Sequence, residues 1–275
     1  MIKILLDTSC DMPQALRDKY GIRWVHFPIN FDTENFYDQK DLGIKEFFQK
    51  IADTGITPKT SQVTQAQFEE AIGEMLVDEG DHVLVITLSS TLSGTYNEAV
   101  KAQETFGADK VTVVDSKLAT IMIGDLAITA AEMIQGGKSI QEIVAVLDEK
   151  KSKREAVFML DTLDFLRKGG RISFAQSVVG GLLNIKVILK YTDGKIVPFE
   201  KAKGKKQGMR IVLDWVKANH VEGSRILIAH AINPEGAEEM KALIQDELGL
   251  EVAAIGEIGA VIGTHVGPGT LAVSC

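Results

Sequence analysis

The sequence predicts an α/β protein of two domains: an N-terminal three-layer α/β/α domain with a parallel sheet, and a C-terminal two-layer α/β domain with a mixed sheet. In the first half, strand-like apolar runs alternate with helix-like segments, which is typical of a parallel sheet covered by helices. In the second half, Asp193-Gly194 separates two apolar runs and indicates an antiparallel hairpin. The 275 residues suffice for two domains, which we expect to be residues 1–151 and 152–275.

The elements of the first domain follow from short apolar runs, assigned to strands, and longer segments with helical spacing, assigned to helices. The expected strands are residues 2–6, 24–30, 82–88 and 110–115. The expected helices are residues 13–20, 44–52, 66–76, 95–106, 121–135 and 139–151. Because ligands bind beyond the carboxyl ends of parallel strands, the polar loops after strands 2–6, 82–88 and 110–115 should share one edge of the sheet.

The second domain has strand-like runs in a different order. The expected strands are residues 156–160, 187–191, 195–199, 225–231 and 251–257. The basic cluster at residues 201–206 is expected to be a solvated loop, with a surface for an anionic partner as the alternative.

Composition and charge exclude several classes of protein. The 30 basic and 38 acidic residues give a net charge of −8, and no basic run indicates nucleic-acid binding. The first seven residues are too short an apolar run for a signal peptide, and no apolar run reaches about eighteen residues, so we expect a cytoplasmic protein without stable membrane insertion. Two cysteines are too few for a disulfide framework or a zinc site.

Motifs for cofactors are missing from the sequence. No P-loop string is present, and the glycines at 259 and 263 lack the spacing of a dinucleotide fingerprint. We therefore expect no bound cofactor, and neither ATP nor NAD as a ligand of this chain alone. Asp7, Asp11 and Asp115 have suitable oxygens for a metal, but caps and turns are the favoured roles, so no metal site is predicted.

The most informative segment is the hydroxyl loop, which we define as residues 87–96. It contains seven hydroxyl side chains and no charged residue. It lies where a strand is expected to turn into a helix, so free N–H groups and the positive end of the helix dipole favour an anion there. Ser93 can hydrogen-bond a carboxylate or phosphate, and Gly94 allows close approach of the backbone. The alternative is that these hydroxyls only cap the helix and close a turn.

Three further segments carry candidate polar groups. Thr60 and Ser61 add two hydroxyls, although an N-cap for the helix that begins near residue 65 would also explain them. Arg171 follows a pair of glycines and could reach a phosphate, or it could follow a helix C-cap and lie on the surface. Thr264 and His265 lie in a glycine-rich run that could wrap a ligand or form a simple turn.

Seven short strings are spread along the chain, and a chance match of all seven in one order is improbable. They are Asp7-Thr8-Ser9-Cys10-Asp11, Thr60-Ser61-Gln62, Ser89-Ser90-Thr91-Leu92-Ser93-Gly94-Thr95-Tyr96, Asp115-Ser116, Lys168-Gly169-Gly170-Arg171, Leu183-Asn184-Ile185-Lys186 and His265-Val266-Gly267-Pro268-Gly269. With this order and spacing, the chain resembles the DegV family over essentially its whole length.

The resemblance implies a protein that holds one long-chain fatty acid in a buried tunnel between its domains. Family members with a role serve as the fatty-acid-binding subunit of bacterial fatty acid kinase. A separate ATP-binding kinase subunit phosphorylates the bound carboxylate, and the acyl phosphate feeds phospholipid synthesis. The chain is then expected to be a non-catalytic, lipid-binding subunit, with the fatty acid and the kinase subunit as partners.

The resemblance also assigns roles by position. The residues expected to bind the ligand carboxylate are Thr60, Ser61, Ser93, Gly94, Thr264 and His265. Arg171 is expected near the mouth of the tunnel, where it would support phosphoryl transfer or docking of the kinase. Met122 and Ile262 are expected to line the tunnel, and Met122 stands where a glycine is expected, so it could narrow the space for the acyl chain.

Two other functions stay open at this stage. The chain could be a lipid carrier or sensor without a kinase partner. It could also be a stand-alone hydrolase or phosphotransferase that uses Ser93 and His265, although no Gly-x-Ser-x-Gly string is present.

Overall fold

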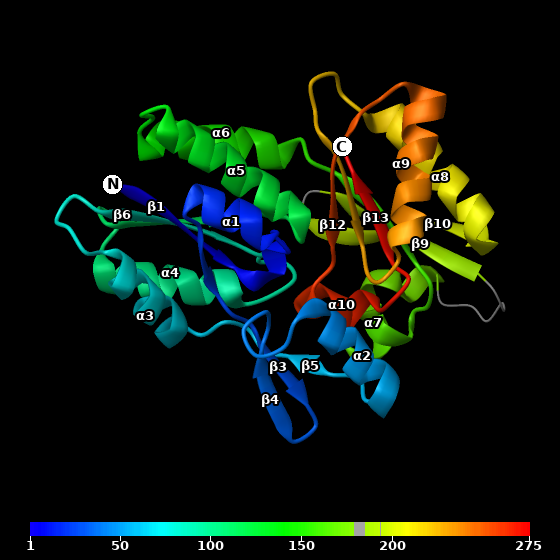
Figure 1. Cartoon of the computed structure of the whole chain (residues 1–275), viewed down its shortest axis with the longest axis horizontal. Helices are drawn as coiled ribbons and strands as arrows, with labels where there is room; N and C mark the ends of the chain where they lie inside the picture. Colours follow the sequence, from blue (N-terminus) through cyan, green and yellow to red (C-terminus); the bar gives the residue numbers. More distant parts are fainter. Residues whose placement is uncertain (179–184, 193) are drawn as a thin grey trace. The chain divides into compact units, whose positions relative to one another are not determined.

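The computed structural model describes residues 1–178, 185–192 and 194–275, and they form two compact units (Figure 1). The first unit comprises Met1–Asn30, Asn35–Leu42 and Thr60–Lys153. The second unit comprises Phe31–Glu34, Gly43–Lys59 and Arg154–Cys275.

A four-stranded parallel sheet with the strand order β2-β1-β6-β7 forms the centre of the first unit. Its strands are β1 (Ile2–Asp7), β2 (Arg23–Val25), β6 (His82–Thr87) and β7 (Val111–Asp115). The two middle strands, β1 and β6, are largely buried and apolar, as expected for a parallel sheet that is covered on both faces.

Helices cover both faces of this sheet (Figure 1). On one face α5 (Ile121–Gln135) packs on β1 and β6 and is joined by α6 (Ile140–Ser152). On the other face α4 (Thr95–Phe106) packs on β7, and α3 (Gln65–Met75) packs on β2. A 3-10 turn, η1 (Thr8–Cys10), and helix α1 (Gln14–Tyr20) follow β1. The three-layer α/β/α arrangement confirms the predicted class.

A six-stranded mixed sheet with the order β10-β9-β8-β13-β11-β12 forms the centre of the second unit. Its strands are β8 (Ala156–Leu160), β9 (Ile185–Thr192), β10 (Lys195–Lys203), β11 (Ile226–His230), β12 (Val252–Glu257) and β13 (Leu271–Ser274). β9 and β10 pair antiparallel, which confirms the hairpin predicted from the dipeptide at 193–194, and only the β11–β12 pair is parallel among the described strands of this sheet. Asp193 itself lies outside the described residues, as do Leu183 and Asn184 of the sixth string.

One face of the mixed sheet packs against two helices, α8 (Gly204–Asn219) and α9 (Pro234–Leu248). Their buried side chains join those of the sheet in one apolar core, which includes Val157, Ile188, Met209, Trp215 and Met240. The short helices α2 (Ile44–Thr54), α7 (Asp164–Lys168) and α10 (Ala260–Val266) contact one another through α10, and η2 (Ile172–Val178) contacts β10.

The structure corrects several predicted elements. The strand expected over 24–30 is broken into β2 and β3 (Pro28–Phe31), and β3 lies between β4 (Glu34–Tyr37) and β5 (Lys59–Thr60) in a small third sheet. The loop expected over 201–206 is wrong, because its residues end β10 and begin α8. The glycine-rich run before His265 is helix α10 rather than a loop.

The predicted boundary between residues 151 and 152 does not by itself separate the two units, because each unit contains more than one segment of the chain. Residues 43–59 group with the second unit because α2 buries Phe47 and Phe48 there. The rings of Phe31 and Phe47 are in edge contact, and Phe48 lies against Gly263 of α10. Within the described residues, no helix is both long and apolar enough to cross a membrane.

Candidate functional site

Three polar loops meet at one edge of the parallel sheet in the first unit. β1, β6 and β7 are neighbours and run parallel, so their carboxyl ends lie at the same edge. η1 follows β1, the hydroxyl loop follows β6, and residues 116–118 follow β7. The structure thus confirms the shared edge that the sequence predicts.

Two carboxylates connect these loops. Asp7, which is fully buried, accepts hydrogen bonds from the backbone N–H of Leu88 at 2.7 Å and from that of Ser9 at 3.1 Å. Asp115 accepts from the N–H of Ser90 at 3.1 Å and from that of Lys117 at 3.0 Å. Both acids therefore have the turn and loop roles that the sequence favours over metal binding.

Burial raises the pKa of Asp7 to about 6, although hydrogen bonds from Ser9 and Leu88 act in the opposite direction. Its charge is held inside the protein by N–H and O–H donors rather than by a cation. A buried carboxylate destabilises the folded state unless both of its oxygens accept hydrogen bonds, so the positions of the donors around Asp7 must be maintained.

Ser93 and Gly94 lie at the start of α4. The N-cap of α4 is Gly94, which offers no side chain to cap the helix. The hydroxyls of Ser93 and Thr95 are 2.9 Å apart and share a hydrogen bond, and Ser93 Oγ accepts from the N–H of Thr95 at 3.3 Å. No hydroxyl therefore caps α4 from the N-cap position, which is the alternative role that the sequence allows for this loop. Ser93 is only partly buried.

The segment after β5 packs against this same helix start. The N–H of Val63 donates to Thr95 Oγ1 at 3.2 Å, and the side-chain amide of Gln62 lies against Gly94, where an added Cβ would be 2.1 Å from its Oε1. Two of the seven strings are thereby brought together. Gln62 was not among the predicted site residues, although it belongs to the string Thr60-Ser61-Gln62.

Thr60 and Ser61 do not cap a helix. The N-cap of α3 is Thr64, which forms a capping box with Gln67. Thr60 ends β5, whereas Ser61 is exposed and its hydroxyl donates to Asn30 at 3.4 Å. The N-cap explanation of these two hydroxyls is therefore wrong.

In the second unit, two other strings meet around His265. Its ring lies against Gly169, where an added Cβ would be 2.4 Å from Nδ1. The ring of Phe165 lies against Gly267 in the same way, at 2.3 Å from the position of a Cβ. Both glycines are therefore required for the close approach of α7 to the end of α10.

The environment of His265 keeps its ring neutral. Burial, the largest cause, and the charge of Arg171 together lower its pKa to about 4, although a hydrogen bond to the backbone of Gly169 acts in the opposite direction. Arg171 is partly buried and donates from Nη1 to the carbonyl of Gly169 at 2.9 Å. Gly169 is the C-cap of α7, as one reading of the sequence expects, but Arg171 is turned back toward this cluster rather than left on the surface.

The three remaining predicted residues lie in helices α5 and α10. Thr264 is fully buried, and its hydroxyl donates to the carbonyl of Ala260 at 2.8 Å, one helical turn earlier. That proton is then not available for a ligand carboxylate. Met122 is buried in α5 of the first unit, and Ile262 is partly buried in α10 of the second.

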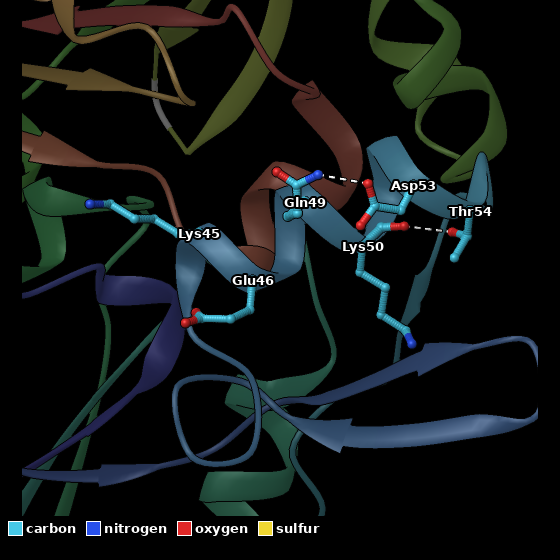
Figure 2. Close-up of a pocket in the computed structure, with 6 residues that line it drawn as sticks. All are labelled: Lys45, Glu46, Gln49, Lys50, Asp53 and Thr54. Carbon is cyan, nitrogen blue, oxygen red and sulfur yellow. Dashed lines mark hydrogen bonds between the residues drawn. The ribbon is translucent and has the colours of Figure 1, made fainter.

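A hollow of about 610 Å³ lies elsewhere, on the surface of α2 (Figure 2). All of its lining residues come from that helix: Lys45, Glu46, Gln49, Lys50, Asp53 and Thr54. Gln49 donates to Asp53, and Lys50 pairs with Glu34 at 2.7 Å. This charged surface lacks the apolar lining that an acyl chain needs, and it contains none of the predicted site residues.

The fold and these clusters define a class: a two-unit α/β protein with a hydroxyl-rich loop on a parallel sheet and a histidine–arginine cluster on a mixed-sheet unit. The family model described as uncharacterised protein, DegV family, matches residues 1–275. The chain belongs to the DegV family.

Relatives and solved structures agree with this assignment. A fatty acid-binding protein of Thermotoga maritima is 35% identical over 276 residues, covering 98% of this chain and 96% of its own length. A fatty-acid-binding DegV family protein from Thermus thermophilus is 32% identical with a TM-score of 0.91, covering 99% of this chain and 98% of its own. DegV, a fatty acid binding protein from Bacillus subtilis, is 30% identical with a TM-score of 0.86, covering 99% of this chain and 98% of its own.

Proposed function

We propose that this protein binds one long-chain fatty acid and that its hydroxyl loop holds the carboxylate. The observation that carries the proposal is the start of α4, where Gly94 leaves the helix without a side-chain cap and Ser93 is only partly buried. Helix N-termini with nearby hydroxyls favour an anionic oxygen. The fatty-acid-binding relatives named above support a lipid carboxylate rather than a free anion.

The head group would be held by neutral donors. Ser93 can turn its proton from Thr95 to the ligand, while Thr60 and Ser61 add hydroxyls on the neighbouring segment. The neutral ring of His265 has one N–H, and this N–H would have to turn from the backbone of Gly169 to the carboxylate. Thr264 is assigned a smaller part, because its hydroxyl is already bonded to Ala260.

The acyl chain would supply most of the affinity. Burial of a sixteen-carbon chain contributes roughly 0.8 kcal/mol per CH₂, or on the order of 12 kcal/mol before the costs of binding. We assign Met122 and Ile262 to the lining of this tunnel. In this proposal the first unit carries the hydroxyl loop together with Thr60 and Ser61, and the second unit closes the tunnel.

We further propose that the bound carboxylate is presented to a separate ATP-dependent kinase subunit. A carboxylate oxygen would attack the γ-phosphate of ATP, so that an acyl phosphate forms and ADP leaves. The sequence contains no P-loop string, so the nucleotide would be bound by the partner. Arg171, held beside His265 by its bond to Gly169, would support the transferring phosphate or the docking of the kinase.

A stand-alone hydrolase or phosphotransferase is the less favoured function. A nucleophilic serine needs a base within hydrogen-bond reach, and the hydroxyl of Ser93 bonds to Thr95 instead. A lipid carrier or sensor without a kinase partner differs from our proposal only in the role of Arg171.

Titration of the delipidated protein with palmitate tests the proposal. We expect one palmitate per chain and no acyl phosphate when only ATP is added. With an ATP-binding subunit present, Arg171→Ala should lower acyl phosphate formation without loss of palmitate binding. Unchanged acyl phosphate formation by Arg171→Ala would remove Arg171 from this step. Palmitate binding with no acyl phosphate in the presence of the ATP-binding subunit would favour the carrier function, and turnover of acyl esters by the chain alone would favour the hydrolase.

A further inference from the structure

The hydroxyl loop is fastened to its neighbours by three successive backbone N–H groups. Leu88 donates to Asp7 at 2.7 Å, Ser89 donates to the carbonyl of Leu118 at 3.0 Å, and Ser90 donates to Asp115 at 3.1 Å. Asp7 and Asp115 are the last residues of β1 and β7, and Leu118 lies in the loop after β7, so the acceptors lie on either side of β6. The path of the chain from β6 toward Ser93 is therefore set from both sides.

Asp7 is the buried member of this group. Its Oδ2 accepts from Leu88, and its Oδ1 accepts from both the N–H and the hydroxyl of Ser9. Two acceptor oxygens are thus placed between donors of two loops. An asparagine has only one acceptor oxygen, so its NH₂ group would face the N–H of either Leu88 or Ser9.

The arrangement is not explained by stability alone. The side chain is fully buried, and the atoms that surround it in its hydrogen bonds are neutral donors rather than a cation. A buried charge of this kind is costly to keep, and a neutral side chain would be cheaper in a loop that had only to close a turn.

We propose that Asp7 is a positioning residue that holds the hydroxyl loop in the shape needed to receive a ligand carboxylate. The inference rests on the function proposed above, because Ser93 and Gly94 are taken as the head-group site. Asp7 acts through Leu88 and does not touch the ligand. Loss of its geometry should weaken recognition of the carboxylate while leaving burial of the acyl chain unchanged.

A positioning role and a purely electrostatic role of Asp7 predict opposite changes in the affinity for an anion. If Asp7 acted only through its negative charge, its removal would strengthen the binding of an anion. If Asp7 acts by position, Asp7→Asn weakens the binding of the anion, because the loop moves when a donor faces the N–H of Leu88 or Ser9.

The experiment compares palmitic acid with 1-hexadecanol, which has the same chain length but no carboxylate, in the wild type and in Asp7→Asn. We expect the variant to bind palmitate about tenfold more weakly, as for the loss of one hydrogen bond to a charged group, and to bind hexadecanol within about twofold of the wild type. Asp18→Asn is the control, because it removes the same charge from an exposed position in α1 and should change neither affinity.

Three results would overturn the inference: unchanged palmitate binding, tighter palmitate binding, or an equal loss for both ligands. A wild-type protein that binds neither ligand would refute the proposed function itself, and this inference with it. If Asp7→Asn does not fold, Ser9→Ala removes one bond from the same carboxylate and should lower the preference for palmitate over hexadecanol about threefold, and an unchanged preference overturns the inference.

Discussion

Replacing Gly169 with alanine should move His265 out of its present position. A Cβ at residue 169 would lie 2.4 Å from Nδ1 of His265, 3.2 Å from its Cε1 and 3.0 Å from the carbonyl oxygen of Phe165. Ordinary contact begins at 3.4 Å, so the ring must move by about 1 Å (3.4 minus 2.4). Crowding of this kind costs about 1–3 kcal/mol of unfolding free energy. The neighbouring carbonyl belongs to the backbone and cannot easily move away.

Gly170 provides a matched control one residue later. Its φ is +73°, and an added Cβ would meet nothing within 4 Å. Gly170→Ala should therefore cost about 1–2 kcal/mol through backbone conformation alone, without contact to the histidine. The two variants are expected to lose similar stability while differing in their effect on His265.

Urea denaturation, NMR titration of the His265 ring and palmitate binding separate these effects. We expect Gly169→Ala to move the pKa of His265 from about 4 toward its ordinary value of 6.5, and to weaken palmitate binding by about tenfold. Gly170→Ala should leave both unchanged. Equal pKa values for His265 in the two variants would show that Gly169 does not set the position of the ring. Equal loss of palmitate affinity in both variants would show that His265 has no role in binding.

Three further predictions follow from named contacts. Ser93→Ala should weaken palmitate binding by about tenfold, checked by calorimetric titration, and undiminished binding would remove Ser93 from the head-group site. The pKa of His265 is about 4 in the folded protein and 6.5 when unperturbed, so the unfolded chain takes up a proton first as the pH falls. The free energy of unfolding should therefore fall by about 3 kcal/mol as the pH drops from 6.5 to 4. Urea denaturation of His265→Gln over this pH range should show a smaller fall. Lys150 pairs at 2.9 Å with Asp125, which is 4% exposed, so Lys150→Met should lower the unfolding free energy by about 3 kcal/mol, and a change below about 1 kcal/mol would contradict a structural role for the pair.

Much of the fold could be predicted from local patterns. The helices at residues 95–106 and 121–135 and the strand at 156–160 agree with the structure at both ends, because each is a continuous apolar or amphipathic segment between clear breaks. The parallel sheet and its loop edge follow from the alternation of these elements. The helix at Pro234 was missed, although Asn233 as N-cap followed by proline is a recognised start signal.

Other elements depend on contacts that the sequence does not show. α10 contains Gly263, which lowers helix propensity, yet the close packing of Phe48 against that glycine needs a residue without a Cβ. Propensity therefore predicts a loop, and tertiary packing produces a helix.

The candidate site shows the same division. The hydroxyl-rich string is visible in the sequence, but the hydrogen bond from Leu88 to Asp7 joins residues 81 positions apart. The approach of Gly169 to His265 likewise joins two strings that local patterns cannot connect. For Thr264 the residue type was suitable, but its place in a helix directs the hydroxyl proton to Ala260. Residue types therefore predict which side chains are candidates for the site, whereas their hydrogen bonds in the folded protein determine which of them can bind a ligand.

The most direct test of fatty-acid binding by this protein is native mass spectrometry of the purified protein, followed by extraction and identification of any bound small molecule. We expect one long-chain fatty acid per chain, or its stoichiometric uptake when the delipidated protein is given palmitate. A protein that is empty and that also fails to take up fatty acids would contradict fatty-acid binding, and would indicate that the hydroxyl loop binds a small polar anion instead.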